Sequence, residues 1–344
     1  MLEILLENNV NVKSKITVVE VAAAANVSIS AVSRAFSGGS CSEKMREKVF
    51  TAAKALNYKP NRLARGLKAK SSLIGILVTD FDNPAYLPIL QQFSAEIQER
   101  NCHSLLVNAS QHRSLSDAIE LVMEYHVDGL IVTATSLPKE LVKACQQQNT
   151  PVVCFARNSL SAEATAVFCD NHIIGQRAAD LILDAGYSRP AFVSGPVGAI
   201  TSRDRQRGFI SRLIERECND WQIIEGGNHS YDAGLQATCK LLRTSEPPDS
   251  LFYTDDIMAC GGMDAARYEF GLKIPEDIGI IGVDDIQLAS SPAYQLTTIR
   301  QPFTDMVSAS TNALFQHIDD QQLAATKIVF PCHVVKRATL RKAI

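Results

Sequence analysis

The sequence predicts an α/β protein with a small helical unit at its N-terminus and a larger body of two halves, each with a parallel sheet. The 344 residues are too many for one ordinary domain. Charge divides the chain: residues 1–70 carry 12 Lys and Arg against 5 Asp and Glu, a net of +7, and the rest carries −10, which together give −3. From residue 73 onward, short apolar runs alternate with helical stretches, as in parallel sheets covered by helices on both faces.

Composition excludes several classes of protein. With 46% hydrophobic residues the chain can bury substantial cores, which excludes a mostly disordered protein. No apolar run is long enough to cross a bilayer, so we expect no transmembrane helix. Residues 1–15 lack the pattern of a signal peptide, and we expect them to be an extension, with a mis-chosen start codon as the alternative. The nine cysteines include no C-x-x-C pair, which favours a reducing cytoplasm over a disulfide framework.

The basic segment has the pattern of three short helices. Thr17 and Glu20 can form a capping box for the first helix, and Ser28 can cap the second. Asn26 lies between them, where a tight turn needs a residue that tolerates positive φ. We expect these helices to cover residues 18–25, 29–36 and 43–57. Two helices joined by a four-residue turn and supported by a third are typical of a helix-turn-helix.

The second of these helices has one exposed side that is small, polar or basic. This side carries Ile29, Ser30, Ser33 and Arg34. In a helix-turn-helix this helix lies in the major groove of DNA, and nearby basic residues contact phosphates. The net charge of +7 favours this interpretation. A three-helix bundle that binds no nucleic acid has the same periodicity, so the pattern alone leaves both alternatives open.

The body repeats one rhythm twice. We expect strands at residues 73–78, 104–109, 129–134 and 151–155, and again at 191–194, 222–225, 251–253 and 278–283. Helical stretches lie at residues 87–100, 115–125, 139–147, 173–185, 203–216, 233–242 and 258–270. Two such runs predict two similar subdomains. Ligands in this architecture bind at the carboxyl ends of the strands, which predicts a cleft between the halves.

Four motifs of the head carry a family resemblance. They are TVVEVA, NVSISAVSRAF, SEKMREKV and LNYKPNRLARGL, followed by the strand LIGILV. Together they resemble the DNA-binding headpiece of the LacI/GalR family of bacterial transcription regulators. The resemblance implies base contacts from Ile29, Ser30 and Arg34. It also implies phosphate or backbone contacts from Thr17, Ser28, Ser33, Tyr58 and Asn61.

The stretch PNRLARGL, residues 60–67, resembles the hinge helix of the same family. Pro60 blocks an upstream helix and Gly66 weakens this one, so a segment this short is marginal as a free helix. An ordinary linker is the alternative. The resemblance implies that paired hinge helices bind the minor groove and that Leu67 wedges between bases. The residues implied to contact DNA are Asn61, Arg62, Ala64 and Leu67.

The body carries further motifs: Asn83-Pro84, Asp170-Asn171, GPVGAITSRDRQRGF, YTDDIMACGGM, GIIGVDD and LTTIRQP. They resemble the effector domain of the LacI/GalR family, which is itself similar to periplasmic sugar-binding proteins. The resemblance implies an effector site formed by Asn83, Tyr86, Thr133, Arg205, His229, Asp255, Asp284 and Phe303. Arg205 and Asp284 would bind ligand hydroxyls, because guanidinium and carboxylate groups form strong, directional hydrogen bonds.

One wall of this site departs from the family pattern. The residue before Arg157 is commonly Asp or Asn in sugar-responsive members, whereas this chain has Ala156. Thr133 stands where some members have an amide. We therefore expect a wall less polar than a simple hexose needs, and a ligand that is smaller, less hydroxylated or not a sugar.

Enzymatic interpretations have weaker support. Asp255-Asp256 and Asp284-Asp285 resemble the carboxylate pair of a glycosidase, but adjacent aspartates at strand ends more often cap helices and bind hydroxyls. The sequence has no G-x-x-x-x-G-K-[ST] phosphate loop, no H-E-x-x-H and no Cys/His cluster with zinc spacing. We expect no catalytic residues, no metal ligands and no cofactor.

We therefore expect a repressor that binds a palindromic double-stranded DNA operator as a homodimer, with a tetramer left open, and that responds to a sugar or related metabolite. The expected parts are an extension at 1–15, a helix-turn-helix at 16–60, a hinge helix at 61–70, and two subdomains at 71–170 with 301–330 and at 171–300 with 331–344. We expect it in the bacterial cytoplasm, at the nucleoid and not at a membrane. A solute-binding protein or a sugar-active enzyme with the same body fold are the alternatives.

Overall fold

The computed structural model describes residues 16–37, 39–59, 71–109, 115–133, 139–158 and 163–342. The chain forms two compact units, Met1–Ala69 and Lys70–Ile344, which are described separately as the headpiece and the body. The extension at 1–15 and the hinge helix at 61–70 lie outside the described residues. The predicted DNA contacts of Asn61, Arg62, Ala64 and Leu67 lie there too.

The headpiece contains the three predicted helices, α1 (Val18–Ala25), α2 (Ile29–Ser37) and α3 (Glu43–Ala55). The capping box forms, since the Thr17 N–H donates to Glu20 Oε2 over 2.6 Å. Asn26 has φ 50°, in the left-handed region that the turn requires. The helix α3 ends two residues before its predicted end, because Asn57 has φ 52° and cannot continue a right-handed helix.

Small and β-branched residues hold the headpiece together. Val21, Val32 and Val49, one from each helix, are fully buried and meet in a common apolar cluster.

In the part of the chain that the structure describes, no single helix is long and apolar enough to cross a bilayer. The bent pair of α1 and α2, which meet at 101°, would meet that requirement by length and composition only.

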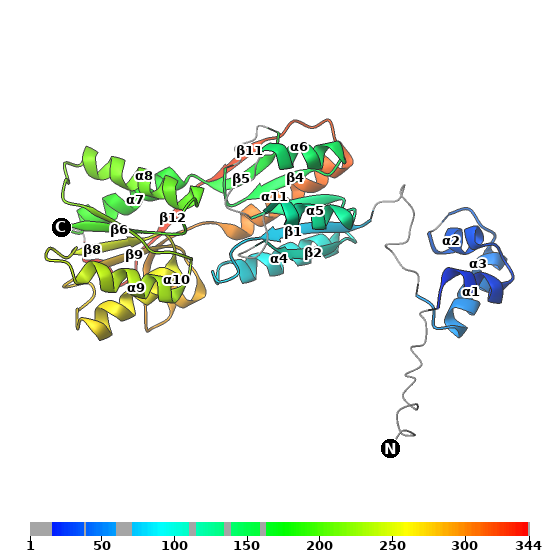
Figure 1. Cartoon of the computed structure of the whole chain (residues 1–344), viewed down its shortest axis with the longest axis horizontal. Coiled ribbons are helices and arrows are strands. Elements are labelled where there is room, and N and C mark those ends of the chain that lie inside the picture. Colours follow the sequence, from blue (N-terminus) through cyan, green and yellow to red (C-terminus); the bar gives the residue numbers. More distant parts are fainter. Residues whose placement is uncertain are drawn as a thin grey trace, which may run out of the picture. The chain divides into compact units, whose positions relative to one another are not determined.

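The body contains two sheets of six strands, and each sheet with its helices is called a lobe (Figure 1). The N-lobe sheet has the order β2-β1-β3-β4-β5-β11 and is parallel throughout. Its strands are β1 (Leu73–Val78), β2 (His103–Asn108), β3 (Gly129–Val132), β4 (Val152–Phe155), β5 (Thr165–Cys169) and β11 (Lys327–Phe330). Its helices are α4 (Tyr86–Glu99), α5 (Leu115–Glu124), α6 (Lys139–Gln147) and α11 (Phe303–Asp319).

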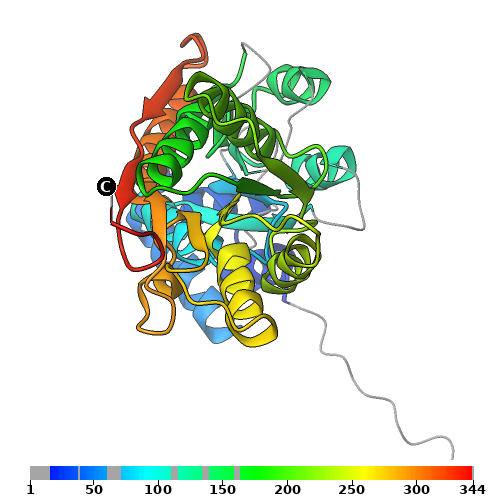
Figure 2. The ribbon, with the colours of Figure 1, turned by 90° about the vertical axis from the view of Figure 1, so that its left-hand side faces the viewer.

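The C-lobe sheet has the corresponding order β7-β6-β8-β9-β10-β12, with only β12 antiparallel to its neighbour. Its strands are β6 (Pro190–Ser194), β7 (Gln222–Glu225), β8 (Ser250–Tyr253), β9 (Gly279–Asp284), β10 (Thr297–Arg300) and β12 (His333–Val335). Its helices are α7 (Asn171–Asp184), α8 (Ile200–Glu215), α9 (Tyr231–Leu242) and α10 (Asp256–Asp264), and they cover both faces of the sheet (Figure 2). A π-helical turn, Ala265–Glu269, continues α10, and a 3₁₀ turn, Gln287–Ser290, follows β9.

Both sheets place their strand ends where a ligand can reach them. The strands β3, β4, β6 and β8 are buried at every residue, as in parallel sheets covered on both faces. In each sheet the strand order reverses at one strand, β1 or β6, which opens a crevice at its carboxyl end.

The prediction of parallel strands alternating with helices is confirmed, but it missed β5, β10, β11 and β12. The chain passes between the lobes three times, after β5, after β10 and between β11 and β12.

Candidate DNA-contacting helix and ligand cavity

The exposed side of α2 presents the residues that were predicted to read bases. Ile29, Ser30, Ser33 and Arg34 are exposed, while Ala31, Val32 and Ala35 on the same helix are buried. A recognition helix needs this division, because one side must reach the groove while the other packs on the headpiece.

The other described DNA candidates lie at the ends of the headpiece helices. The Thr17 side chain belongs to the capping box of α1, and Ser28 Oγ accepts the Ala31 N–H over 3.2 Å. The Tyr58 ring is half-buried, with its centroid 5.9 Å from that of Phe36. These residues are therefore held by the fold itself, at the start of α1, the start of α2 and just after α3.

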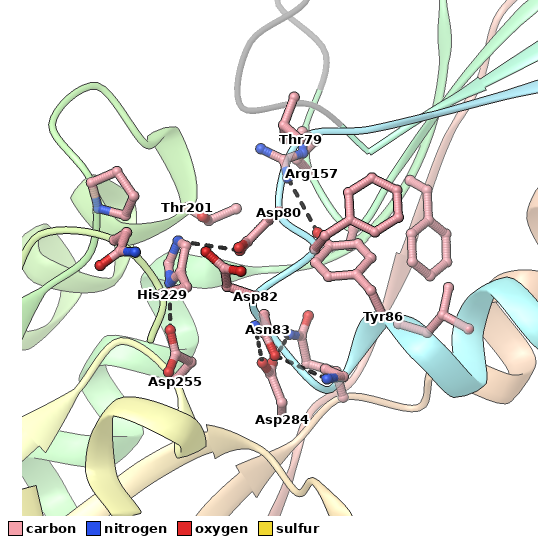
Figure 3. Close-up of a pocket in the computed structure, with 18 of the residues that line it drawn as sticks. Thr79, Asp80, Asp82, Asn83, Tyr86, Arg157, Thr201, His229, Asp255 and Asp284 are labelled. Carbon is pink, nitrogen blue, oxygen red and sulfur yellow. Dashed lines mark hydrogen bonds and ion pairs between the residues drawn. The ribbon is translucent and has the colours of Figure 1, made fainter. Parts of the chain in front are cut away.

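A cavity of about 510 Å³ lies between the two lobes of the body. Seven of the eight predicted effector-site residues line it: Asn83, Tyr86, Arg205, His229, Asp255, Asp284 and Phe303. Thr133 does not line it, because this residue is fully buried and its hydroxyl donates to the Leu77 carbonyl over 3.0 Å. Figure 3 shows charged side chains from both lobes converging on this space.

The carboxylate of Asp284 enters the cavity from the end of β9. The residue has φ 109°, a conformation that non-glycine residues adopt at a cost and that is found mainly at functional sites. Its Oδ1 accepts from Gln301 Nε2 over 2.7 Å, and its Oδ2 accepts from Asn83 Nδ2 of the opposite lobe over 3.4 Å. Burial raises the pKa of Asp284, and the Arg205 charge opposes that rise.

Close packing of α7 on α8 positions Arg205. A Cβ at Gly175 of α7 would lie only 2.0 Å from the Arg205 carbonyl oxygen, so this crossing requires glycine. The Arg205 Nε donates to Asn171 Oδ1 over 2.8 Å, and its Nη1 donates to the Thr254 carbonyl. The guanidinium is therefore held in place beside the cavity before any ligand arrives.

His229 links carboxylates from the two lobes. Its Nδ1 hydrogen-bonds Asp255 Oδ2, and its Nε2 lies 3.8 Å from Asp80 Oδ2, which belongs to the loop after β1 (Figure 3). The pKa of His229 is raised above its ordinary value. Burial alone would lower this pKa, but the nearby negative charges of Asp255 and Asp80 outweigh the effect of burial. Burial also raises the pKa of Asp80 to about 6, although the His229 charge opposes this. Asp255 additionally caps α10 by accepting the Met258 N–H over 2.9 Å.

Sequence reasoning did not assign several lining residues. Arg157, which follows β4, lines the cavity and is only 7% exposed. Asp80 follows β1, Asn108 ends β2 and Gln301 follows β10, and all three also line the cavity. Each is a polar residue at the carboxyl end of a strand, and this position in the sequence could have identified it as a lining residue.

Two family models match separate parts of the chain. Residues 17–61 match the model of bacterial regulatory proteins of the lacI family, and residues 179–340 match that of a periplasmic binding protein-like domain. The chain is 30% identical over 329 residues to the ribose operon repressor of Halalkalibacterium halodurans, covering 94% of this chain and 97% of that protein. It is 31% identical to the ribose operon repressor of Bacillus subtilis, covering 95% of this chain and 99% of that protein.

A solved structure extends this similarity to the fold of the nearly complete chain. The lac repressor dimer bound to operator and the anti-inducer ONPF superposes with a TM-score of 0.79 at 25% identity, covering 95% of this chain and 99% of that chain. The predicted fold class and family resemblance are confirmed. This chain therefore belongs to the LacI family of bacterial regulatory proteins, and it is a DNA-binding, ligand-responsive transcription regulator rather than an enzyme.

Proposed function

We propose that this regulator is a repressor that binds a palindromic operator as a homodimer and is controlled by a small sugar-like metabolite in the cavity. The observation that carries the proposal is one chain with both parts: an exposed polar side of α2 and a charged cavity at the strand ends. The similar proteins reported above are repressors by name, and one of them is a dimer on its operator. As a bacterial transcription regulator it works in the cytoplasm, and we propose that it associates with the nucleoid.

The proposed parts keep the predicted boundaries. Residues 16–60 would bind the major groove, residues 61–70 would form the hinge helix, and the two subdomains would be 71–170 with 301–330 and 171–300 with 331–344. The DNA contacts would come from the headpiece residues named above and from the four hinge residues outside the described part. The effector contacts would come from the seven lining residues, and Thr133 would support the wall from behind.

Ligand binding can be coupled to DNA binding through the start of the N-lobe. The N–H groups of Ser71 and Ser72 donate to the two oxygens of Asp128 over 2.9 and 2.8 Å. The chain is therefore tied to the N-lobe directly after the hinge segment. A ligand that changes the arrangement of the lobes would change the spacing of two hinge segments in a dimer, and operator DNA would bias the same equilibrium in return.

The test is fluorescence anisotropy of the full chain on DNA from upstream of its own gene, with a scrambled duplex of equal length. We expect tight binding to the first duplex and weak binding to the second at physiological salt. Arg34→Ala should weaken specific binding by about 1–3 kcal/mol, because a base contact is lost, and should leave the body folded. Equal, weak binding of both duplexes would refute the operator claim.

Leu67→Ala tests the hinge. A wedge residue acts only on the kinked operator, so this variant should lose more affinity for the operator than for the scrambled duplex. An equal loss on both duplexes would show that residue 67 has no wedge role. Leu63→Ala, four residues earlier in the same segment, is the matched control.

A further inference from the structure

Arg157 is a buried charged side chain that lines the cavity and is only partly hydrogen-bonded. Among the described residues, Arg157 donates from Nη2 to the Thr133 carbonyl and lies 3.5 Å from the Tyr86 hydroxyl, and its Nε and Nη1 have no hydrogen-bond partner. No described carboxylate forms an ion pair with Arg157 within 4.0 Å. Leaving such donors buried and unpaired is costly, so an acceptor from outside the protein is expected to satisfy them.

The residue before Arg157 supplies no side-chain acceptor. Ala156 precedes it, lines the cavity, and has φ 61°. Asn or Asp would tolerate this left-handed conformation better than Ala and would bring a side-chain oxygen. Because alanine has no side-chain oxygen, a ligand can occupy the space that an acidic side chain would fill here and can supply the negative charge that it would carry.

The acidic residues of the cavity are mostly engaged elsewhere. Asp255 is bound by His229, and Asp284 is bound by Gln301 and Asn83. Figure 3 shows both carboxylates well separated from Arg157, which lies at the opposite end next to Thr79. Asp80 lies between the two ends, and its carboxylate faces His229 Nε2 at 3.8 Å. Positive charge is therefore available at one end and hydroxyl acceptors at the other.

We propose that the ligand of this cavity is a polyhydroxy carboxylate, with its carboxylate paired to Arg157 and its hydroxyls bound at Asp284 and Arg205. A planar guanidinium matches a carboxylate in a two-point contact that no neutral hydroxyl reproduces. The inference rests on the proposed function, since it takes the cavity as the effector site, and it adds the chemical class of the effector.

The first experiment is titration calorimetry of the full chain with matched pairs of ligands. Each sugar acid is compared with its neutral parent: gluconate with glucose, ribonate with ribose, and galacturonate with galactose. We expect at least one acid to bind about tenfold or more tightly than its parent, as for other buried charge pairs. If no acid binds at millimolar concentration, or if the neutral parents bind equally or more tightly, the proposal is wrong.

Two variants of one residue then separate charge from shape. Ala156→Asp and Ala156→Asn both suit φ 61°, but only aspartate places a carboxylate beside Arg157. Asp should weaken binding of the acid about tenfold or more, and Asn should change it only about threefold or less. Equal effects of the two variants would contradict a charge pair. The anisotropy assay on operator DNA is independent of these outcomes, so the regulator can be confirmed while the ligand class fails.

Discussion

The two walls of the cavity hold their charged side chains in different ways. On the C-lobe wall, Arg205 donates to Asn171 and Thr254, and Asp255 is bound by His229. On the N-lobe wall, Arg157 has two nitrogens without a hydrogen-bond partner among the described residues, and the one ion-pair contact of Asp80 within that part of the chain is with His229 Nε2 at 3.8 Å. The C-lobe wall is therefore organised by the fold before a ligand binds, whereas the N-lobe wall is completed by the ligand. Organisation in advance lowers the cost of binding, and an incomplete wall determines which ligand is accepted.

Replacing the two arginines gives the largest expected difference between the walls. Arg205→Ala removes two hydrogen bonds from a charged group and leaves their acceptors buried, so it should lower the free energy of unfolding by about 2–4 kcal/mol. Arg157→Ala also removes an under-bonded buried charge, so its cost should be about 1 kcal/mol or less. Urea unfolding of the full chain, followed by Trp221, measures both, since Trp221 is the only tryptophan and packs on the core of the body.

The same two variants have a functional readout. Arg205→Ala should abolish the ligand response while specific DNA binding remains. Arg203→Ala is the matched control on α8, because this side chain is 53% exposed and lies 3.7 Å from Asp204. If Arg157→Ala destabilises the body as much as Arg205→Ala, the contrast between the walls is refuted.

Asp80→Asn should have the next largest effect, and its sign depends on pH. Because the pKa is raised from 3.8 to about 6, the folded chain binds this proton more tightly than the unfolded chain. The stabilising contribution is complete below pH 3.8 and is lost as the pH rises through about 6. At pH 7.5 the variant should therefore be more stable than the wild type by about 1–3 kcal/mol, and the gain should shrink toward pH 4.

Urea unfolding at several pH values checks this prediction. Asp82→Asn is the control, because Asp82 lines the same cavity but is exposed, and it should change stability little at any pH. A destabilised Asp80→Asn at pH 7.5 would mean that the contact with His229 outweighs the cost of burying this carboxylate.

The smallest expected effect concerns the backbone of the N-lobe wall. Ala156→Asn should stabilise the body by about 0.5–1 kcal/mol, since asparagine tolerates φ 61° better than alanine. Thermal unfolding without ligand measures it, and Ala185→Asn, at a buried residue with φ −85°, should destabilise because it relieves no strain and buries an amide in the core. A loss of stability in Ala156→Asn would show that space, and not backbone strain, limits position 156.

Much of the fold and of the site followed from patterns in the sequence. Alternating apolar runs predicted the sheets, and the family motifs predicted seven of the lining residues. The sequence could not predict that Arg157 lines the cavity and Thr133 does not, because both residues follow a strand. The Thr133 N–H and hydroxyl both donate to Leu77, which turns its side chain toward the sheet, whereas the left-handed turn at Ala156 precedes Arg157. Such turns depend on the packed structure and leave no periodic signal.

The three crossings between the lobes have a consequence for genetics. No single cut in the gene separates the two lobes, because β11 completes the N-lobe sheet and β12 the C-lobe sheet from adjacent positions late in the chain. A stop codon shortly after Asp319 would remove one edge strand from each lobe at once, although every residue that lines the cavity is encoded before it. We therefore expect such truncated alleles to lose the folded body entirely. Functional fusion proteins should retain both β11 and β12.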